Sequence, residues 1–149
     1  IPVFEQAVAT GGYGGAAKGP VHRVSFGTGY VRDSLFECFQ ENLDHFPVLL
    51  PVSYDKPAER LKHLRLHNGT IWRWNRPLVG YDNDGTPHLR IEHRVLPAGP
   101  TVVDSIASAA FFYGLVHALA SSDVIAEGQL PFATARGRFS MMSFVAARA

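Results

Sequence analysis

The chain has 149 residues, of which 46% are hydrophobic, 11% aromatic and 18% charged. This composition excludes a disordered protein and predicts a single domain over residues 1–149 with a hydrophobic core. Lys and Arg total 14 against 13 Asp and Glu, a balance that indicates neither a nucleic-acid partner nor a membrane surface. No uninterrupted apolar run reaches the ~18 residues of a membrane span. The single cysteine, Cys38, excludes an internal disulfide, and we expect a cytoplasmic protein.

The first segment of the chain is rich in glycine and predicts a loop. Residues 12–17 match the dinucleotide pattern G-x-G-x-x-A, but that pattern binds phosphate only where a helix follows it. Lys18, Gly19 and Pro20 would end such a helix after about one turn. We therefore interpret the segment as a flexible loop that can move over a site. Residues 21–26 then alternate apolar and polar side chains, which predicts a strand with one wet face.

Residues 32–46 predict the first helix. Asp33 or Ser34 is the expected N-terminal cap, and Pro47 follows the end. Five apolar residues line one side of this helix: Leu35, Phe36, Phe39, Leu43 and Phe46.

Two short elements follow this helix. Residues 48–53 predict a strand, placed at a sheet edge because Pro51 has no backbone N–H to donate. Residues 55–57 then open a short basic helix. Asn68 and Gly69 are typical of the end of such a helix.

Residues 70–96 contain two runs of strand character. They flank residues 81–86, whose Asn, Asp and Gly tolerate turn conformations, so the pattern predicts an antiparallel hairpin. Side chains on a strand alternate between its two faces. The second run thus has one apolar face (Leu89, Ile91, His93, Val95) and one wet face (His88, Arg90, Glu92, Arg94). The first run has Trp72, Trp74 and Arg76 on one face and Ile71, Arg73 and Asn75 on the other.

Residues 101–120 predict the longest helix of the chain. Thr101 and Asp104 resemble a capping box, and the interior is apolar nearly all round, which predicts a helix buried on several sides. Residues 121–130 predict a loop and residues 131–149 a last helix. Because strands and helices mix without regular βαβ alternation, the fold class is α+β, an antiparallel sheet with helices packed on one face.

The wet face of the hairpin is the main candidate site. Arg76 and Arg90 lie beside Glu92 and Arg94 on it. One interpretation is an ordinary salt-bridged outer face of a sheet. The other is an anion and metal site, because arginine forks bind phosphate and carboxylate oxygens and a carboxylate binds hard divalent cations.

Two other features carry weaker signals. His63 and His67 lie four residues apart on a helix and are a possible metal pair, although no third ligand is evident and solvated helix histidines are the alternative. Cys38 lies beside the phenylalanine stripe and is interpreted as a buried small hydrophobe.

Three segments in order resemble the glutamate–cysteine ligase family. They are IWRWNRP at residues 71–77, LRIEHRV at residues 89–95, and GPTVVD at residues 99–104 before the long apolar helix. The likeness is to the bacterial branch related to carboxylate–amine ligases, which share a glutamine synthetase-like catalytic fold. It extends from about residue 4 to residue 120, and more loosely through residues 131–138.

The resemblance implies a ligase that uses ATP to join the γ-carboxylate of glutamate to the amine of cysteine or another amine, a step of glutathione biosynthesis. It implies that Glu92 binds Mg²⁺ or Mn²⁺ and that Arg76 binds the ATP phosphates. It also implies that Arg94 contacts the transferred phosphoryl group or the substrate carboxylate. Arg90 and His88 share the wet face and are lesser candidates for nucleotide binding.

The chain departs from this family in its carboxylates. Family members are longer and carry further metal-binding carboxylates on earlier strands, whereas the acidic residues Glu5, Glu37, Glu41 and Glu59 lie in helical contexts here. One carboxylate does not hold the several cations that this phosphoryl transfer uses. We therefore expect a fragment, a later part of the catalytic domain that is inactive alone. Trp72 and Trp74 either shape its pocket or belong to the sheet core.

Two alternatives to the ligase remain. The first is a non-catalytic ligase-like module for binding or oligomerisation, and the second is a metal hydrolase that uses His63 and His67. An exposed edge at residues 48–53 is expected to pair with other strands, so we expect a homo-oligomer.

Overall fold

The computed structural model describes residues 23–54, 58–95 and 99–146. The glycine-rich segment with its G-x-G-x-x-A match lies outside the described residues. Among the described residues there are five α-helices and one two-stranded antiparallel sheet, which confirms the α+β class. The described chain divides into two compact units with the boundary between His93 and Arg94.

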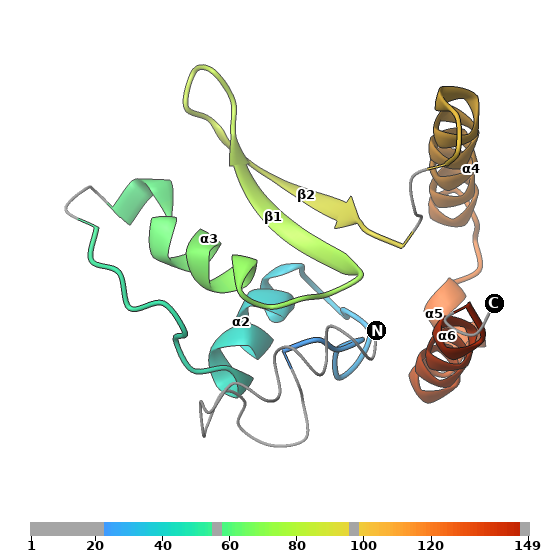
Figure 1. Cartoon of the computed structure of the whole chain (residues 1–149), viewed down its shortest axis with the longest axis horizontal. Coiled ribbons are helices and arrows are strands. Elements are labelled where there is room, and N and C mark those ends of the chain that lie inside the picture. The colour runs from blue at the N-terminus through green and yellow to red at the C-terminus, as the bar shows by residue number, and fades with distance from the viewer. Residues whose placement is uncertain (1–22, 55–57, 96–98, 147–149) are drawn as a thin grey trace. The chain divides into compact units, whose positions relative to one another are not determined.

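The first unit contains α2 (Phe36–His45), the short 3-10 helix η1 (Ala58–Arg60), α3 (Lys62–Gly69), β1 (Asn75–Tyr81) and β2 (Pro87–His93). Figure 1 shows the β1–β2 hairpin arching over α3, with α2 on the other side of α3.

The hairpin is confirmed. Its register pairs Asn75 with His93 at one end and Tyr81 with Pro87 at the other. Gly85 closes the turn with a φ of 90°, a conformation that glycine adopts without steric cost. The apolar face is not buried, however: Leu89 and Ile91 are 55% and 46% exposed.

The predicted first strand run is longer than the observed strand. Trp72 and Trp74 precede β1, which begins at Asn75. Trp72 instead forms an isolated parallel bridge with Val24, and its N–H donates to the carbonyl of Arg23 at 2.7 Å. The strand predicted at residues 21–26 is therefore reduced, in its described part, to this one bridge.

Helix α2 begins later than predicted, at Phe36, and its N-cap residue, Leu35, forms no side-chain cap bond. Instead a carboxylate in the first turn binds the segment that leads into the helix. The Glu37 carboxylate accepts the backbone N–H groups of Asp33 at 2.7 Å, Ser34 at 2.9 Å and Arg32 at 3.2 Å. These bonds, that of Asp33 above all, hold the pKa of Glu37 below its ordinary value. Ser34, one of the two expected caps, forms a local bond: its Oγ accepts the N–H of Phe36.

The apolar stripe of α2 is buried only in part. Phe39 and Phe46 are buried, whereas Phe36 and Leu43 are exposed. Together with Val24 and Ile71 the two buried rings form the small hydrophobic core of the unit.

A chain of buried polar side chains joins α2, α3 and β1. Arg73 Nη2 donates to Asn42 Oδ1 at 2.9 Å, and Asn42 Nδ2 donates to Asn68 Oδ1 at 3.0 Å. Asn68 Nδ2 then donates to the carbonyl oxygen of Pro77 at 2.8 Å. Arg73 also forms an ion pair with Glu41 at 2.7 Å. Because buried polar groups are costly unless paired, this chain fixes where β1 lies against the helices.

Residues 48–53 do not form the predicted edge strand. Pro51 has no N–H to offer a ladder, and the N–H of Val52 donates to the carbonyl of Leu50 two residues earlier at 2.9 Å. The next predicted helix ends at Gly69 as expected. It is interrupted at Leu61, whose positive φ of 45° separates η1 from α3.

The second unit contains α4 (Val102–Ala120), α5 (Ala126–Gln129) and α6 (Phe132–Ala146). The capping box of Thr101 and Asp104 at the start of α4 is confirmed. In contrast to the predicted burial, none of the described residues of α4 is buried. Helix α5 lies within the predicted loop at residues 121–130.

Helix α4 is also the one candidate membrane span among the described residues, by length and composition alone. It has 19 residues and a mean hydropathy of 1.5. One such helix is weak evidence, because a core helix of a soluble domain has the same composition.

Candidate functional site

The register of the hairpin gathers ionic side chains on one of its faces. Arg76 lies opposite Glu92, and Leu78 lies opposite Arg90. Directly opposite residues point to the same side of a sheet, so both arginines and the carboxylate share one face, as the sequence predicts. Arg76 holds Glu92 through Nε at 3.0 Å and Nη2 at 2.8 Å, both to Oε2.

This face forms one wall of a cavity of about 520 Å³. Helix α3 supplies the facing residues, and the lining consists of Phe39, Tyr54, Lys62, Arg65, Leu66, Asn68, Gly69, Arg76, Leu78, Val79 and Arg90. The volume is within the ~300–1,000 Å³ of small-molecule sites. Four of the lining residues are cationic and none is acidic, so the cavity suits an anion.

The cations of the cavity differ in their partners. Arg76 is neutralised by Glu92. Lys62 Nζ lies 5.4 Å from the centre of the Tyr54 ring, and Arg65 Cζ lies 5.8 Å from that of Tyr81. Cation–π contacts of this kind orient a cation without neutralising it. The charges of Lys62 and Arg65 therefore remain available to an anionic ligand.

The residues of the cavity do not fit a divalent cation held by the protein. Glu92, the predicted metal ligand, is bound to Arg76, and the described lining contains no carboxylate. No group of three or more His, Cys, Asp or Glu side chains in the described residues is placed to bind a metal. Hard divalent cations take several oxygen ligands, and one carboxylate paired with an arginine does not provide them.

The remaining predicted site residues do not line this cavity. Arg94 is the first residue of the second unit. His88 packs over Gly80, and its Nδ1 lies 3.2 Å from Asp82 Oδ1. Trp72 and Trp74 precede β1 and do not line the cavity.

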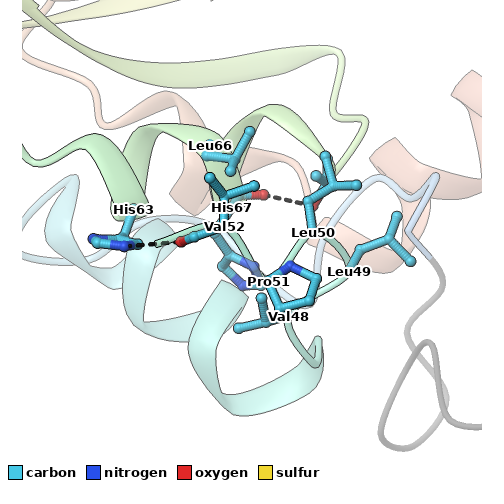
Figure 2. A pocket seen from close by; sticks show the side chains of 9 residues that line it. Val48, Leu49, Leu50, Pro51, Val52, His63, Leu66 and His67 are labelled. Carbon is cyan, nitrogen blue, oxygen red and sulfur yellow. Dashed lines mark hydrogen bonds between the residues drawn. The ribbon is translucent and has the colours of Figure 1, made fainter. Parts of the chain in front are cut away.

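His63 and His67 line a separate, smaller cavity of about 80 Å³ (Figure 2). His63 Nε2 lies 3.1 Å from the carbonyl oxygen of Val52, and His67 Nε2 lies 3.2 Å from that of Asn42. Figure 2 shows the His63 ring directed at the Val52 carbonyl. The His63 contact joins α3 to the segment at residues 48–53, and the His67 contact joins α3 to α2. Among the described residues no third metal ligand accompanies the two histidines.

The sequence analysis missed Lys62, Arg65 and Tyr54 as site residues. The sequence does contain one indication of two of them. Lys62 and Arg65 are three residues apart on a short helix, and this spacing places both on one side of it. That this side faces the hairpin depends on the buried contacts of Asn42 and Asn68, which no local pattern predicts.

Comparison of the chain with known proteins finds no relative. No protein-family model matches the chain, and neither a curated protein nor a solved structure matches it. The resemblance to glutamate–cysteine ligases therefore depends on the quoted segments alone.

Proposed function

We propose that this chain is part of an ATP-dependent carboxylate–amine ligase, nearest to glutamate–cysteine ligase, and that its first unit binds the phosphate groups of the nucleotide. The observation that carries the proposal is the cavity beside the hairpin, with Arg76 and Arg90 on one wall and no acidic lining residue. The proposal includes a glutamine synthetase-like fold for the whole enzyme and a cytoplasmic location.

The chemistry of such a ligase has two steps. A carboxylate oxygen of glutamate attacks the terminal phosphorus of ATP, and ADP leaves. The amine nitrogen then attacks the acyl carbon, phosphate leaves, and the amine loses a proton as the amide forms. The protein contributes mainly alignment and charge stabilisation to phosphoryl transfer. Arg76 and Arg90 are placed to bind phosphate oxygens, with Glu92 orienting the Arg76 guanidinium.

Calorimetric titration of Mg·ATP into the full chain tests the proposal. Arg76→Ala removes a charge-assisted contact, and we expect it to weaken binding by about 10- to 100-fold. Arg138→Ala, an exposed arginine of α6, is the matched control and should leave binding unchanged. Absence of Mg·ATP binding by the parent chain would contradict the proposal.

A second candidate function, a non-catalytic oligomerisation module, is supported by α4. Its large apolar side chains, Val102, Val103, Ile106, Phe111 and Tyr113 among them, are exposed in the described structure. Contiguous exposed apolar surface is typical of interaction sites. Sedimentation equilibrium across micromolar concentrations tests this candidate, and a monomer throughout would remove it.

A further inference from the structure

We propose that the cavity between α3 and the hairpin binds a linear oligophosphate without a divalent cation, and that Lys62 and Arg65 bind it from the α3 wall. The inference rests on the proposed function for the kind of ligand, a phosphate chain. It goes further by adding the α3 wall and by replacing the metal with the cations of the cavity itself.

The first argument is the charge of the walls. Lys62, Arg65 and Arg90 form no ion pair within the described residues, and they line the same hollow as Arg76. Like charges that line one cavity repel one another, although water weakens the repulsion where the side chains are exposed, as Arg65 and Arg90 are. A bound polyanion relieves this repulsion.

The second argument is that the cations are held in place before a ligand arrives. The ring of Tyr54 lies beneath Lys62 Nζ, and the ring of Tyr81 lies beneath Arg65 Cζ. Glu92 holds Arg76 on the facing wall. Side chains that are already positioned lose less entropy when they bind, which favours affinity.

The third argument concerns the shape of the ligand. Two cations come from α3 and two from the hairpin, so a ligand with charges along its length meets both walls. Arginine forks match phosphate oxygens, and lysine binds phosphate as a point charge. A cavity of about 520 Å³ accommodates several linked phosphate groups.

The fourth argument is the absence of free acidic groups from the lining. A metal-dependent phosphate site needs carboxylates for the cation, and no carboxylate lines the described cavity. Glu92, which lies opposite Arg76 in the hairpin, is bound to that arginine. In this proposal Lys62, Arg65 and Arg90 neutralise the phosphate chain instead, beside the Arg76 guanidinium that Glu92 holds.

The test is calorimetric titration of sodium tripolyphosphate into the full chain in EDTA. We expect binding, weakened about tenfold by Lys62→Ala and by Arg65→Ala. Arg60→Ala is the matched control: Arg60 Cζ lies 5.0 Å from the centre of the same Tyr81 ring but does not line the cavity. It removes the same charge and should change binding less than twofold. Lys62→Arg keeps the charge and should retain binding, which separates ligand contact from a folding defect.

Three outcomes would overturn the inference. The first is tripolyphosphate binding only when Mg²⁺ is added, and the second is equal weakening by Arg60→Ala, which would indicate unspecific attraction. The third is preferential binding of glutamate, which would assign the cavity to a dicarboxylate. Mg·ATP binding without tripolyphosphate binding would leave the ligase proposal standing and reject this one. Tripolyphosphate binding without Mg·ATP binding would support the oligophosphate site and reject the ligase proposal.

Discussion

Replacing Asn68 with alanine removes the middle of the buried polar chain that joins α2, α3 and β1. Asn68 is 3% exposed. It accepts a hydrogen bond from Asn42 Nδ2 at 3.0 Å and donates one to the Pro77 carbonyl at 2.8 Å. The substitution leaves both of those buried groups without their partner. At about 1–3 kcal/mol for each unsatisfied group, the free energy of unfolding should fall by about 2–6 kcal/mol.

Urea denaturation followed by tryptophan fluorescence measures this loss. Both tryptophans of the chain, Trp72 and Trp74, lie in the first unit, so the signal reports on the unit that contains Asn68. With an m value of about 2 kcal/mol/M, the midpoint should fall by about 1–3 M. Asn83→Ala, at an exposed turn position, is the control and should change stability by about 0.5 kcal/mol or less. An Asn68→Ala midpoint equal to that of the control would refute the reasoning.

Three further predictions follow from local contacts. Glu37 should titrate below 4.5 by NMR because its carboxylate accepts backbone N–H bonds, that of Asp33 first. Since the pKa is lowered in the folded state, the bonds stabilise the start of α2 above the unfolded pKa, and the stabilisation disappears as the pH falls through the folded pKa. Glu37→Gln should abolish this acid dependence, and a midpoint at or above 4.5 would contradict it. Burial raises the pKa of the Cys38 thiol, so its reaction with a disulfide reagent at pH 8 should be slower in the native chain than in urea; equal rates would argue against burial. Gly27→Ala should lower the free energy of unfolding by about 1 kcal/mol or more, because φ is +95° and a Cβ would lie 3.0 Å from a guanidinium nitrogen. Gly29→Ala, with no atom within 4 Å of its Cβ, should be close to neutral.

The elements predicted best are those specified by neighbouring residues. The hairpin turn ends in Gly85 at positive φ, and the capping box of Thr101 and Asp104 begins α4. In both cases the interactions lie within five residues of one another, so the pattern carries the information. The strand predicted at residues 48–53 does not form. Pro51 was expected only to place it at a sheet edge, but the N–H of Val52 donates to the carbonyl of Leu50 and so is not available to a ladder.

The burial of individual residues was much harder to predict. Leu89 and Ile91 are exposed, while Asn42, Asn68 and Arg73 are buried. Composition predicts the opposite, because polar side chains are usually at the surface. They are buried here because each finds a partner on another element, and those partners lie 9 to 31 residues away in the sequence.

The residues of the candidate site also fall into two groups, those that a local pattern predicts and those that depend on long-range packing. The alternation of β2 by itself determined that Arg90 and Glu92 share a face, and the turn made Arg76 their neighbour, because side chains on a strand alternate with period two. Only the tertiary structure decided that Lys62 and Arg65 face these residues across a cavity. The reason is physical: a strand pattern fixes which side a residue occupies, but what lies opposite depends on long-range packing, here on the buried bonds that hold α3 against β1.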